Sequence, residues 1–219
     1  MTAPTTFRID FVSDVACPWC AIGLAGLRQA LARLDGEIVA DIHLQPFELS
    51  PQMSAEGEDA AEHLRHKYNI GEDQLEANRK AIRERAAALG VTIRHDPGTR
   101  VYNTFDAHRL LHWADEQDNA RALELKQALF RAYFDSNDNV ADHSVLIRLA
   151  GEAGLDTEAA ARVLATDEYA PEVRELEQHW QQAGIHSVPA TIVNGKQLIP
   201  GGQPPEVFER ALREIAAQG

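Results

Sequence analysis

The chain has 219 residues, of which 44% are hydrophobic and 25% charged, so it is long enough to bury a core without disulfides or a structural metal. Acidic residues outnumber basic residues by 34 to 21, which gives a formal net charge of −13. A surface of this charge repels phosphate backbones and anionic lipid, so we expect no nucleic acid and no membrane as partner. The densest basic run, residues 79–85, is interleaved with acids and is typical of a solvated helix face.

No stretch approaches the roughly 20 apolar residues that are needed to cross a bilayer. The first six residues contain neither a basic nor an apolar segment of the kind that begins a secretory signal. We therefore expect a cytoplasmic protein. In that compartment a close pair of cysteines is more often catalytic or metal-binding than structural.

Residues 7–11 alternate between apolar and polar, which predicts a first strand. After it come the two cysteines of the chain, Cys17 and Cys20, and then leucines at helical spacing over residues 24–34, stopped by Gly36. Residues 38–44 alternate again and predict a second strand. The N-terminal part is therefore expected to be a β-α-β unit.

Nearly everything from residue 55 to residue 184 has the pattern of helix, with breaks at glycines, prolines and asparagines. The expected helices cover residues 60–68, 73–89, 104–116, 120–134, 144–153, 157–165 and 171–183. Their apolar stripes are explained by packing within this region.

At the C-terminal end, residues 190–193 and 196–199 flank Asn194-Gly195, a strong signal for a two-residue hairpin. Pro204-Pro205 then opens a last helix. We predict an α/β fold in which residues 1–54 and 185–219 form one discontinuous domain and residues 55–184 form a helical insertion.

The cysteines belong to a Cys-Pro-Trp-Cys motif at the start of the first helix. Pro18 suits the first helical position, because its missing N–H would have no partner there. Cys17 then caps the helix, beside unpaired N–H groups and the positive end of the helix dipole, which stabilise a thiolate. Cys20 lies one turn later and continues the apolar stripe. The motif therefore predicts a redox pair, with Cys17 as the exposed attacking nucleophile and Cys20 as the shielded resolving thiol.

Three other interpretations of the motif stay open. A structural disulfide would close too short a loop to constrain the unfolded chain much. A zinc site would need two further ligands, and His108 and His112 lack a finger-like spacing from the cysteines, so we expect no metal. The motif could also be incidental, although its place between a strand and a helix is typical of a redox site.

A second signal is Ser187-Val188-Pro189, just before the expected strand at residues 190–193. Bonds that precede proline are the only common cis peptides. A cis bond here would turn the backbone of Val188 toward the Cys17 sulfur, where an extended substrate peptide could pair with it. A trans proline that ends a loop fits the same residues.

These blocks together resemble the DsbA family, and more closely its FrnE-like branch. The similar stretches are residues 14–20, the helical insertion, residues 188–195, and the shorter blocks 46–49, 103–109 and 201–204. The resemblance implies a thioredoxin fold with an all-helical insertion, catalytic Cys17 and Cys20, and a cis bond at Pro189. It also implies that Pro18, Trp19, Val188 and Pro189 lie beside the substrate.

The resemblance differs at one position between the cysteines. The best-known members carry a histidine where this chain has Trp19, which offers no charge to stabilise a thiolate. Their strongly oxidising potential is therefore not carried over to this chain.

Four polar residues allow two interpretations. Asn103, Thr104 and His108 could form a polar wall near the active site, or Asn103 or Thr104 could cap a helix while His108 is a satisfied interior histidine. Asp14, three residues before Cys17, could accept a proton or only shape a loop.

We expect a thiol–disulfide oxidoreductase that acts on cysteine-containing proteins, peptides or small molecules. It requires no cofactor and is compatible with glutathione as redox partner. The alternative is a glutathione-dependent transferase or isomerase of the kappa-class or 2-hydroxychromene-2-carboxylate isomerase type, although a second thiol would be superfluous there. A non-enzymatic holdase is a third option. The sequence sets neither the direction of electron flow nor the oligomeric state.

Overall fold

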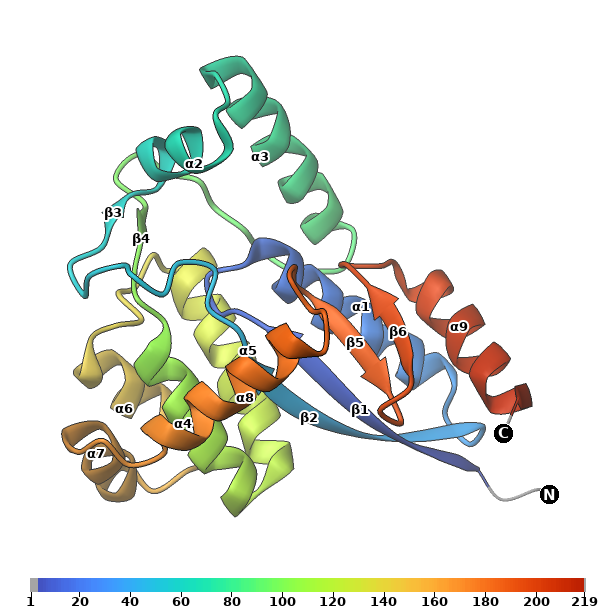
Figure 1. Cartoon of the computed structure of the whole chain (residues 1–219). Helices are drawn as coiled ribbons and strands as arrows, with labels where there is room; N and C mark the ends of the chain where they lie inside the picture. The colour runs from blue at the N-terminus through green and yellow to red at the C-terminus, as the bar shows by residue number, and fades with distance from the viewer. Residues whose placement is uncertain (1–3, 219) are drawn as a thin grey trace.

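The computed structural model describes residues 4–218, so residues 1–3 and 219, at the two ends of the predicted discontinuous domain, lie outside it. Its central sheet has the strand order β2-β1-β5-β6 (Figure 1). The strands are β1 (Thr5–Ser13), β2 (Ile38–Pro46), β5 (Ala190–Val193) and β6 (Gln197–Pro200). β1 and β2 are parallel and connected through α1 (Pro18–Arg33), whereas β5 is antiparallel to β1 and β6 to β5. The predicted thioredoxin fold is confirmed, with a β-α-β and a β-β-α unit sharing one sheet.

The two faces of the sheet are covered by different helices because side chains alternate along β1. Phe7, Ile9 and Phe11 enter the core that α1 shares with α9 (Pro205–Gln218). Val12 lies on the opposite face, in a second cluster with Trp180 of α8 (Ala170–Gln182). The period-two pattern of the first strand therefore decides which layer lies on which side.

The insertion contains the helices expected from the sequence. They are α2 (Ala60–Tyr68), α3 (Glu72–Ala87), α4 (Phe105–Gln117), α5 (Asn119–Phe134), α6 (His143–Glu152), α7 (Thr157–Ala165) and α8. Several begin where an aspartate side chain accepts hydrogen bonds from the first free N–H groups, as at Asp59, Asp118, Asp142 and Asp156. In Figure 1, α2 and α3 project above the sheet, and α4 to α7 pack together beside it at the lower left.

The sequence missed one small element. β3 (Glu58–Asp59) and β4 (Arg100–Val101) form a two-stranded antiparallel ladder that ties the start of α2 to the segment before α4. Two residues are too short to show an alternating pattern, so no sequence signal predicts them.

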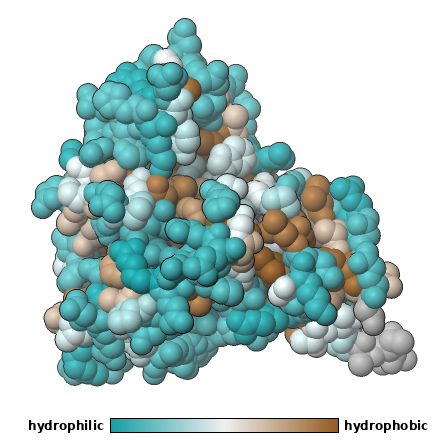
Figure 2. Space-filling view, in the orientation of Figure 1, coloured by the Kyte–Doolittle hydropathy of each residue, from teal (hydrophilic) through white to brown (hydrophobic). Residues whose placement is uncertain are grey.

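The larger of the two buried clusters extends across both the sheet domain and the insertion. It runs from β1 through Cys20 and Leu24 of α1 to Leu129 of α5 and Leu110 of α4. Within residues 4–218, none of the helices combines the length and the apolar character that a membrane span requires. The face shown in Figure 2 is mainly hydrophilic, with apolar residues gathered over β5 and β6 and below the α2–α3 pair.

Candidate active site

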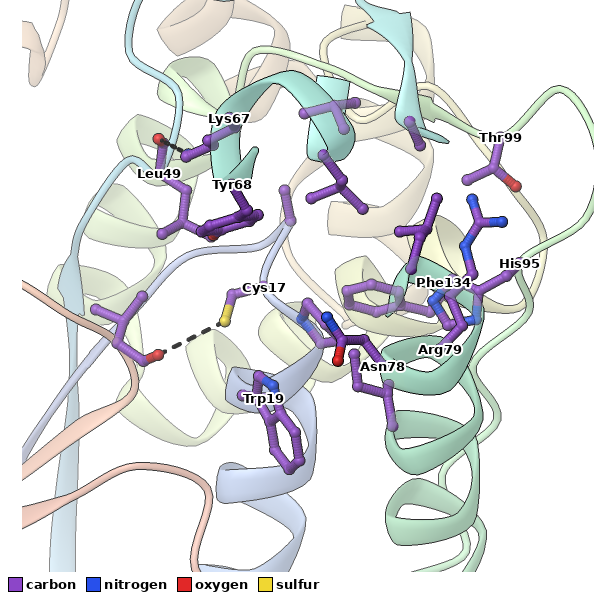
Figure 3. Close-up of a pocket in the computed structure, with 18 of the residues that line it drawn as sticks. Cys17, Trp19, Leu49, Lys67, Tyr68, Asn78, Arg79, His95, Thr99 and Phe134 are labelled. Atoms are coloured by element: carbon purple, nitrogen blue, oxygen red, sulfur yellow. Dashed lines mark hydrogen bonds between the residues drawn. The ribbon is translucent and has the colours of Figure 1, made fainter. Parts of the chain in front are cut away.

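Cys17 occupies the N-cap of α1, with φ −94° and ψ 113°, and Pro18 takes the first helical position. The carbonyl of Cys17 accepts a hydrogen bond from the N–H of Cys20 at 3.0 Å, which closes the first turn of the helix. The Sγ of Cys17 lies 3.7 Å from the carbonyl oxygen of Val188 (Figure 3). The residue is only 4% exposed, so the expectation of an exposed nucleophile is wrong. The Val188 loop and the insertion enclose it, and it borders a cavity instead of the open surface.

Cys20 is completely buried in the core beneath Cys17. Burial raises the pKa of its thiol well above the usual range, and the neighbouring Cys17 adds to this shift. Both residues are free thiols in this structure. The pair therefore consists of one sulfur that borders a cavity and one that solvent does not reach.

The Val188–Pro189 peptide bond is cis, as the resemblance implied. Two glycines allow α1 to approach this loop closely. A Cβ at Gly23 would lie 2.9 Å from Pro189 Cγ, and a Cβ at Gly202 would lie 2.7 Å from the carbonyl oxygen of Trp19. Since both distances are shorter than real Cβ contacts, only glycine fits at these two positions without a shift of the loop.

A cavity of about 800 Å³ opens beside Cys17. Four of the predicted site residues line it: Cys17, Pro18, Trp19 and Val188. Trp19 is 37% exposed, and Tyr68 of α2, which also lines the cavity, is 56% exposed. Arg79 of α3, His95 and Phe134 line the side that faces away from Val188 (Figure 3). The cavity therefore lies between the redox motif and the helices of the insertion.

Sequence reasoning missed the insertion side of this cavity. It assigned residues 79–85 to a solvated helix face, yet Arg79 is half-buried and its Nε has no solvent contact. His95 gave no signal at all, because it lies in a segment without regular structure. Only the packing of α3 over the redox motif brings these side chains to the site.

The residues predicted as a polar wall are engaged with the chain itself. Asp14 is fully buried and accepts hydrogen bonds from the N–H of Leu49 at 2.7 Å and of Ala16 at 3.2 Å. Burial alone would raise the pKa of Asp14, but hydrogen bonds from His108 and Leu49 outweigh it and lower the pKa. Asp14 is therefore a carboxylate that joins the loop before Cys17 to the loop after β2.

Asn103 and His108 hold neighbouring loops. Asn103 accepts from the N–H of Phe105 at 2.9 Å and donates to the carbonyl of Met53 at 3.1 Å. His108 is 3% exposed, and its Nε2 donates to the carbonyl of Phe47 at 3.1 Å. The N-cap of α4 is Thr104, so Asn103 bonds the helix from one position before the cap, and His108 Nε2 also lies 3.5 Å from Asp14 Oδ1. A role of these residues as an active-site wall stays a prediction.

A charged residue that the sequence did not single out lies under the cysteines. Lys126 of α5 is 1% exposed. Burial lowers the pKa of Lys126 to about 8, against the attraction of Cys20, Asp14 and Cys17, which raises it. No pattern in the sequence distinguishes Lys126 from a surface lysine of a helix.

Within the described part of the chain, no three His, Cys, Asp or Glu side chains gather in a way that could hold an ion. His108 donates to a backbone carbonyl, as described above, and His112 lies 3.8 Å from Glu116 on the same helix.

Comparison with known proteins places these features in context. A sequence model of the DSBA-like thioredoxin domain matches residues 8–213. The crystal structure of a probable DsbA oxidoreductase from Streptomyces coelicolor is 34% identical, with a TM-score of 0.88 over 97% of this chain and 91% of that chain. The uncharacterized protein YwbO of Bacillus subtilis is 28% identical over 214 residues, which are 95% of this chain and 97% of YwbO.

A more distant structure shares the fold alone. The cytosolic disulfide reductase DsbM of Pseudomonas aeruginosa, solved with GSH, is 19% identical, with a TM-score of 0.65 over 96% of this chain and 99% of that chain.

Proposed function

The chain belongs to the DSBA-like thioredoxin domain family, and we propose that it is a thiol–disulfide oxidoreductase that works through Cys17 and Cys20. The observation that carries this proposal is the different placement of the two sulfurs. Cys17 caps a helix and borders a cavity, whereas Cys20 is sealed in the core one turn later. This arrangement suits disulfide exchange, with one attacking thiol that a substrate reaches through the cavity and one shielded resolving thiol.

In the proposed reaction the Cys17 thiolate attacks one sulfur of a substrate disulfide. The substrate S–S bond breaks, a Cys17–substrate mixed disulfide forms, and the other substrate sulfur leaves as a thiolate. Cys20 then loses its proton and attacks the Cys17 sulfur, which releases the second substrate thiol and leaves a Cys17–Cys20 disulfide. Two electrons pass from the protein dithiol to the substrate, and the reverse sequence oxidises a substrate dithiol.

Proteins and peptides with cysteines are the proposed substrates. The carbonyl of Val188, 3.7 Å from the Cys17 sulfur, is placed to accept a hydrogen bond from the backbone of an extended peptide. Trp19 and Tyr68 present exposed aromatic surface at the same cavity. These features support a substrate that is held by its backbone and by an apolar side chain.

Glutathione is the proposed electron donor when the protein acts as a reductase. Two glutathione molecules would return the Cys17–Cys20 disulfide to the dithiol and would themselves become one glutathione disulfide. The cavity beside Cys17 supports this step, because it is large enough for a small thiol to reach the sulfur. A cytoplasmic location fits this donor and stays a prediction from the sequence.

Reduction of insulin disulfides by a thiol donor tests the proposal. Cys17→Ser is expected to reduce the rate to the uncatalysed background, because a hydroxyl does not replace the thiolate at neutral pH. Ala25→Ser, on the same helix and half-exposed, is the matched control and should keep the rate of the wild type. Full activity of a folded Cys17→Ser protein would overturn the mechanism.

A further inference from the structure

The cavity beside Cys17 is basic, although the protein as a whole is acidic. Its lining includes the cations Lys67, Arg79 and Arg94 but a single carboxylate, Glu48, in a chain whose formal net charge is −13. Glu48 is bound by the guanidinium of Arg174. An excess of positive charge in a cavity of a negatively charged protein attracts an anionic ligand.

The three cations differ in how much of their charge is already paired. The Nζ of Lys67 donates to the carbonyl of Leu49 at 2.5 Å, and Arg94 forms an ion pair with Asp135 at 2.7 Å. No carboxylate lies within 4.0 Å of the Arg79 guanidinium in residues 4–218, since Glu76, one turn before it, pairs with Arg83 at 2.6 Å. Lys67 likewise has no carboxylate within 4.0 Å in these residues, but its ammonium is bound by the carbonyl of Leu49 and the hydroxyl of Ser50, whereas Arg79 keeps a buried N–H without a hydrogen bond.

Two polar atoms at this end of the cavity are buried and without a hydrogen-bond partner in the described chain: Nε of Arg79 and Nδ1 of His95. Burial, then the charges of Arg79 and Arg83, lowers the pKa of His95 to about 4, so its imidazole is neutral at pH 7. A planar guanidinium is well suited to bind a carboxylate through two hydrogen bonds. The residues that carry these atoms line the same cavity as Cys17 (Figure 3).

The lining of the cavity is mainly apolar, although Asn78 and Thr99 also belong to it. Its apolar residues include Leu64, Leu75, Ile82, Val101 and Phe134. A volume of about 800 Å³ suits a small molecule of drug-like size. A ligand that fills this space needs an apolar body between the end that reacts with Cys17 and the charged end that binds Arg79.

We propose that the cavity binds a low-molecular-weight disulfide with an apolar body and a terminal carboxylate, which Arg79 binds while Cys17 attacks the sulfur. This inference rests on the proposed function and adds a substrate class to it. Cys17 forms a mixed disulfide with one half of the ligand and releases the other half as a thiolate. Cys20 then displaces the bound half, so the protein dithiol supplies both electrons.

The test compares two substrate series that differ only at the end remote from sulfur. Symmetrical disulfides of ω-mercaptoalkanoic acids are matched with those of ω-mercaptoalkanols of equal chain length. The reduced full-length protein is mixed with each disulfide, the reaction is stopped with an alkylating reagent, and mass spectrometry gives the rate of Cys17–Cys20 disulfide formation. We expect the acid to react about tenfold faster or more than the alcohol at the best chain length.

Arg79→Gln is expected to bring the ratio of acid to alcohol rates close to one, because the acid loses its ionic partner and the alcohol never had one. Arg85→Gln is the matched control, because it removes the same charge from the same helix but from an exposed side chain that does not line the cavity. The inference is overturned if the wild type reacts equally with both series, or if the two arginine variants lower the acid rate equally. Cys17-dependent reaction with the alcohol disulfides would leave the proposed function intact in either case.

Discussion

Lys126 is 1% exposed, and its Nζ lies 5.1 Å from the ring centroid of Phe130. An ammonium group that loses its hydration destabilises the folded state unless nearby negative charge compensates for it. The charges that favour the ammonium are those of Cys20, Asp14 and Cys17. Lys126 therefore belongs electrostatically to the redox pair, although it lies in the helical insertion.

Lys126→Met is expected to stabilise the dithiol protein at pH 7 and to lose this advantage at high pH. The pKa of Lys126 is about 8 in the folded protein, against 10.5 as its ordinary value. Below pH 8 Lys126 is protonated in both the folded and the unfolded protein, and the folded protein bears the full cost of burying the ammonium group, up to about 3 kcal/mol. As the pH rises from about 8 to 10.5, the folded state releases its proton first and the penalty disappears. Denaturant unfolding of both proteins across this range measures the effect, and a pH-independent difference would contradict it.

The same substitution is expected to make the redox pair more reducing. A cation near the cysteines stabilises thiolates, which exist only in the dithiol form, so its loss favours the disulfide. The reduction potential should fall by about 30 mV for each tenfold change in the equilibrium constant. Titration against glutathione buffers measures this. An unchanged or higher potential in Lys126→Met would show that the lysine does not stabilise the thiolates.

At the scale of elements, α1 and the loop at Pro189 form the frame of the site. Their contact depends on Gly23, where a Cβ would lie 2.9 Å from Pro189 Cγ and 3.3 Å from Gly202 Cα. The approach keeps the carbonyl of Val188 next to the Cys17 sulfur. Any side chain at position 23 must move the loop or the helix.

Gly23→Ala is expected to destabilise the protein and slow insulin reduction. Alanine would gain about 1 kcal/mol in helix propensity, but the overpacking costs about 1–3 kcal/mol, so the net change is a loss of up to about 2 kcal/mol. Gly71→Ala is the control, because it is exposed, its φ is −82° and a Cβ there would meet nothing within 4 Å. Thermal unfolding and the insulin assay measure both effects. A Gly23→Ala protein as active and stable as the wild type would show that the close approach is not required.

The elements themselves could largely be predicted from the sequence, because their signals are local. Aspartates such as Asp118 and Asp156 mark helix starts, and the alternation in β1 and the Asn194-Gly195 turn mark the sheet. The phase of α1 also predicts that Cys20 faces inward. Local patterns do not say how α3 and α5 pack against α1, because that packing depends on contacts between residues far apart in the sequence. Arg79 and Lys126 therefore look like ordinary surface residues in the sequence.

At the scale of the whole molecule, the predicted domain and the insertion share one buried core. Cys20 and Leu27 of α1 belong to the same cluster as Leu125 and Leu129 of α5 and Leu149 of α6. The domain boundaries predicted from the sequence, at residues 54–55 and 184–185, divide the chain but do not divide this core. We propose that the two parts unfold together, because neither can leave without exposing the apolar surface of the other.

A single cooperative unfolding transition is therefore expected in denaturant. Tryptophans report from both parts, with Trp19 in α1, Trp113 in α4 and Trp180 in α8. Their fluorescence should change at the same denaturant concentration as the far-ultraviolet circular dichroism. Two separated transitions would show that the insertion is an independent unit.

The central claim is that Cys17 attacks and Cys20 resolves. Cys20→Ser removes the resolving thiol, so the first mixed disulfide should accumulate when the reduced variant meets a disulfide peptide. Peptide mapping by mass spectrometry should find a substrate cysteine linked to Cys17 through a mixed disulfide. Added thiol should release it. If reduced Cys20→Ser forms no adduct, while reduced Cys17→Ser forms one at Cys20, the assignment of the two roles is contradicted.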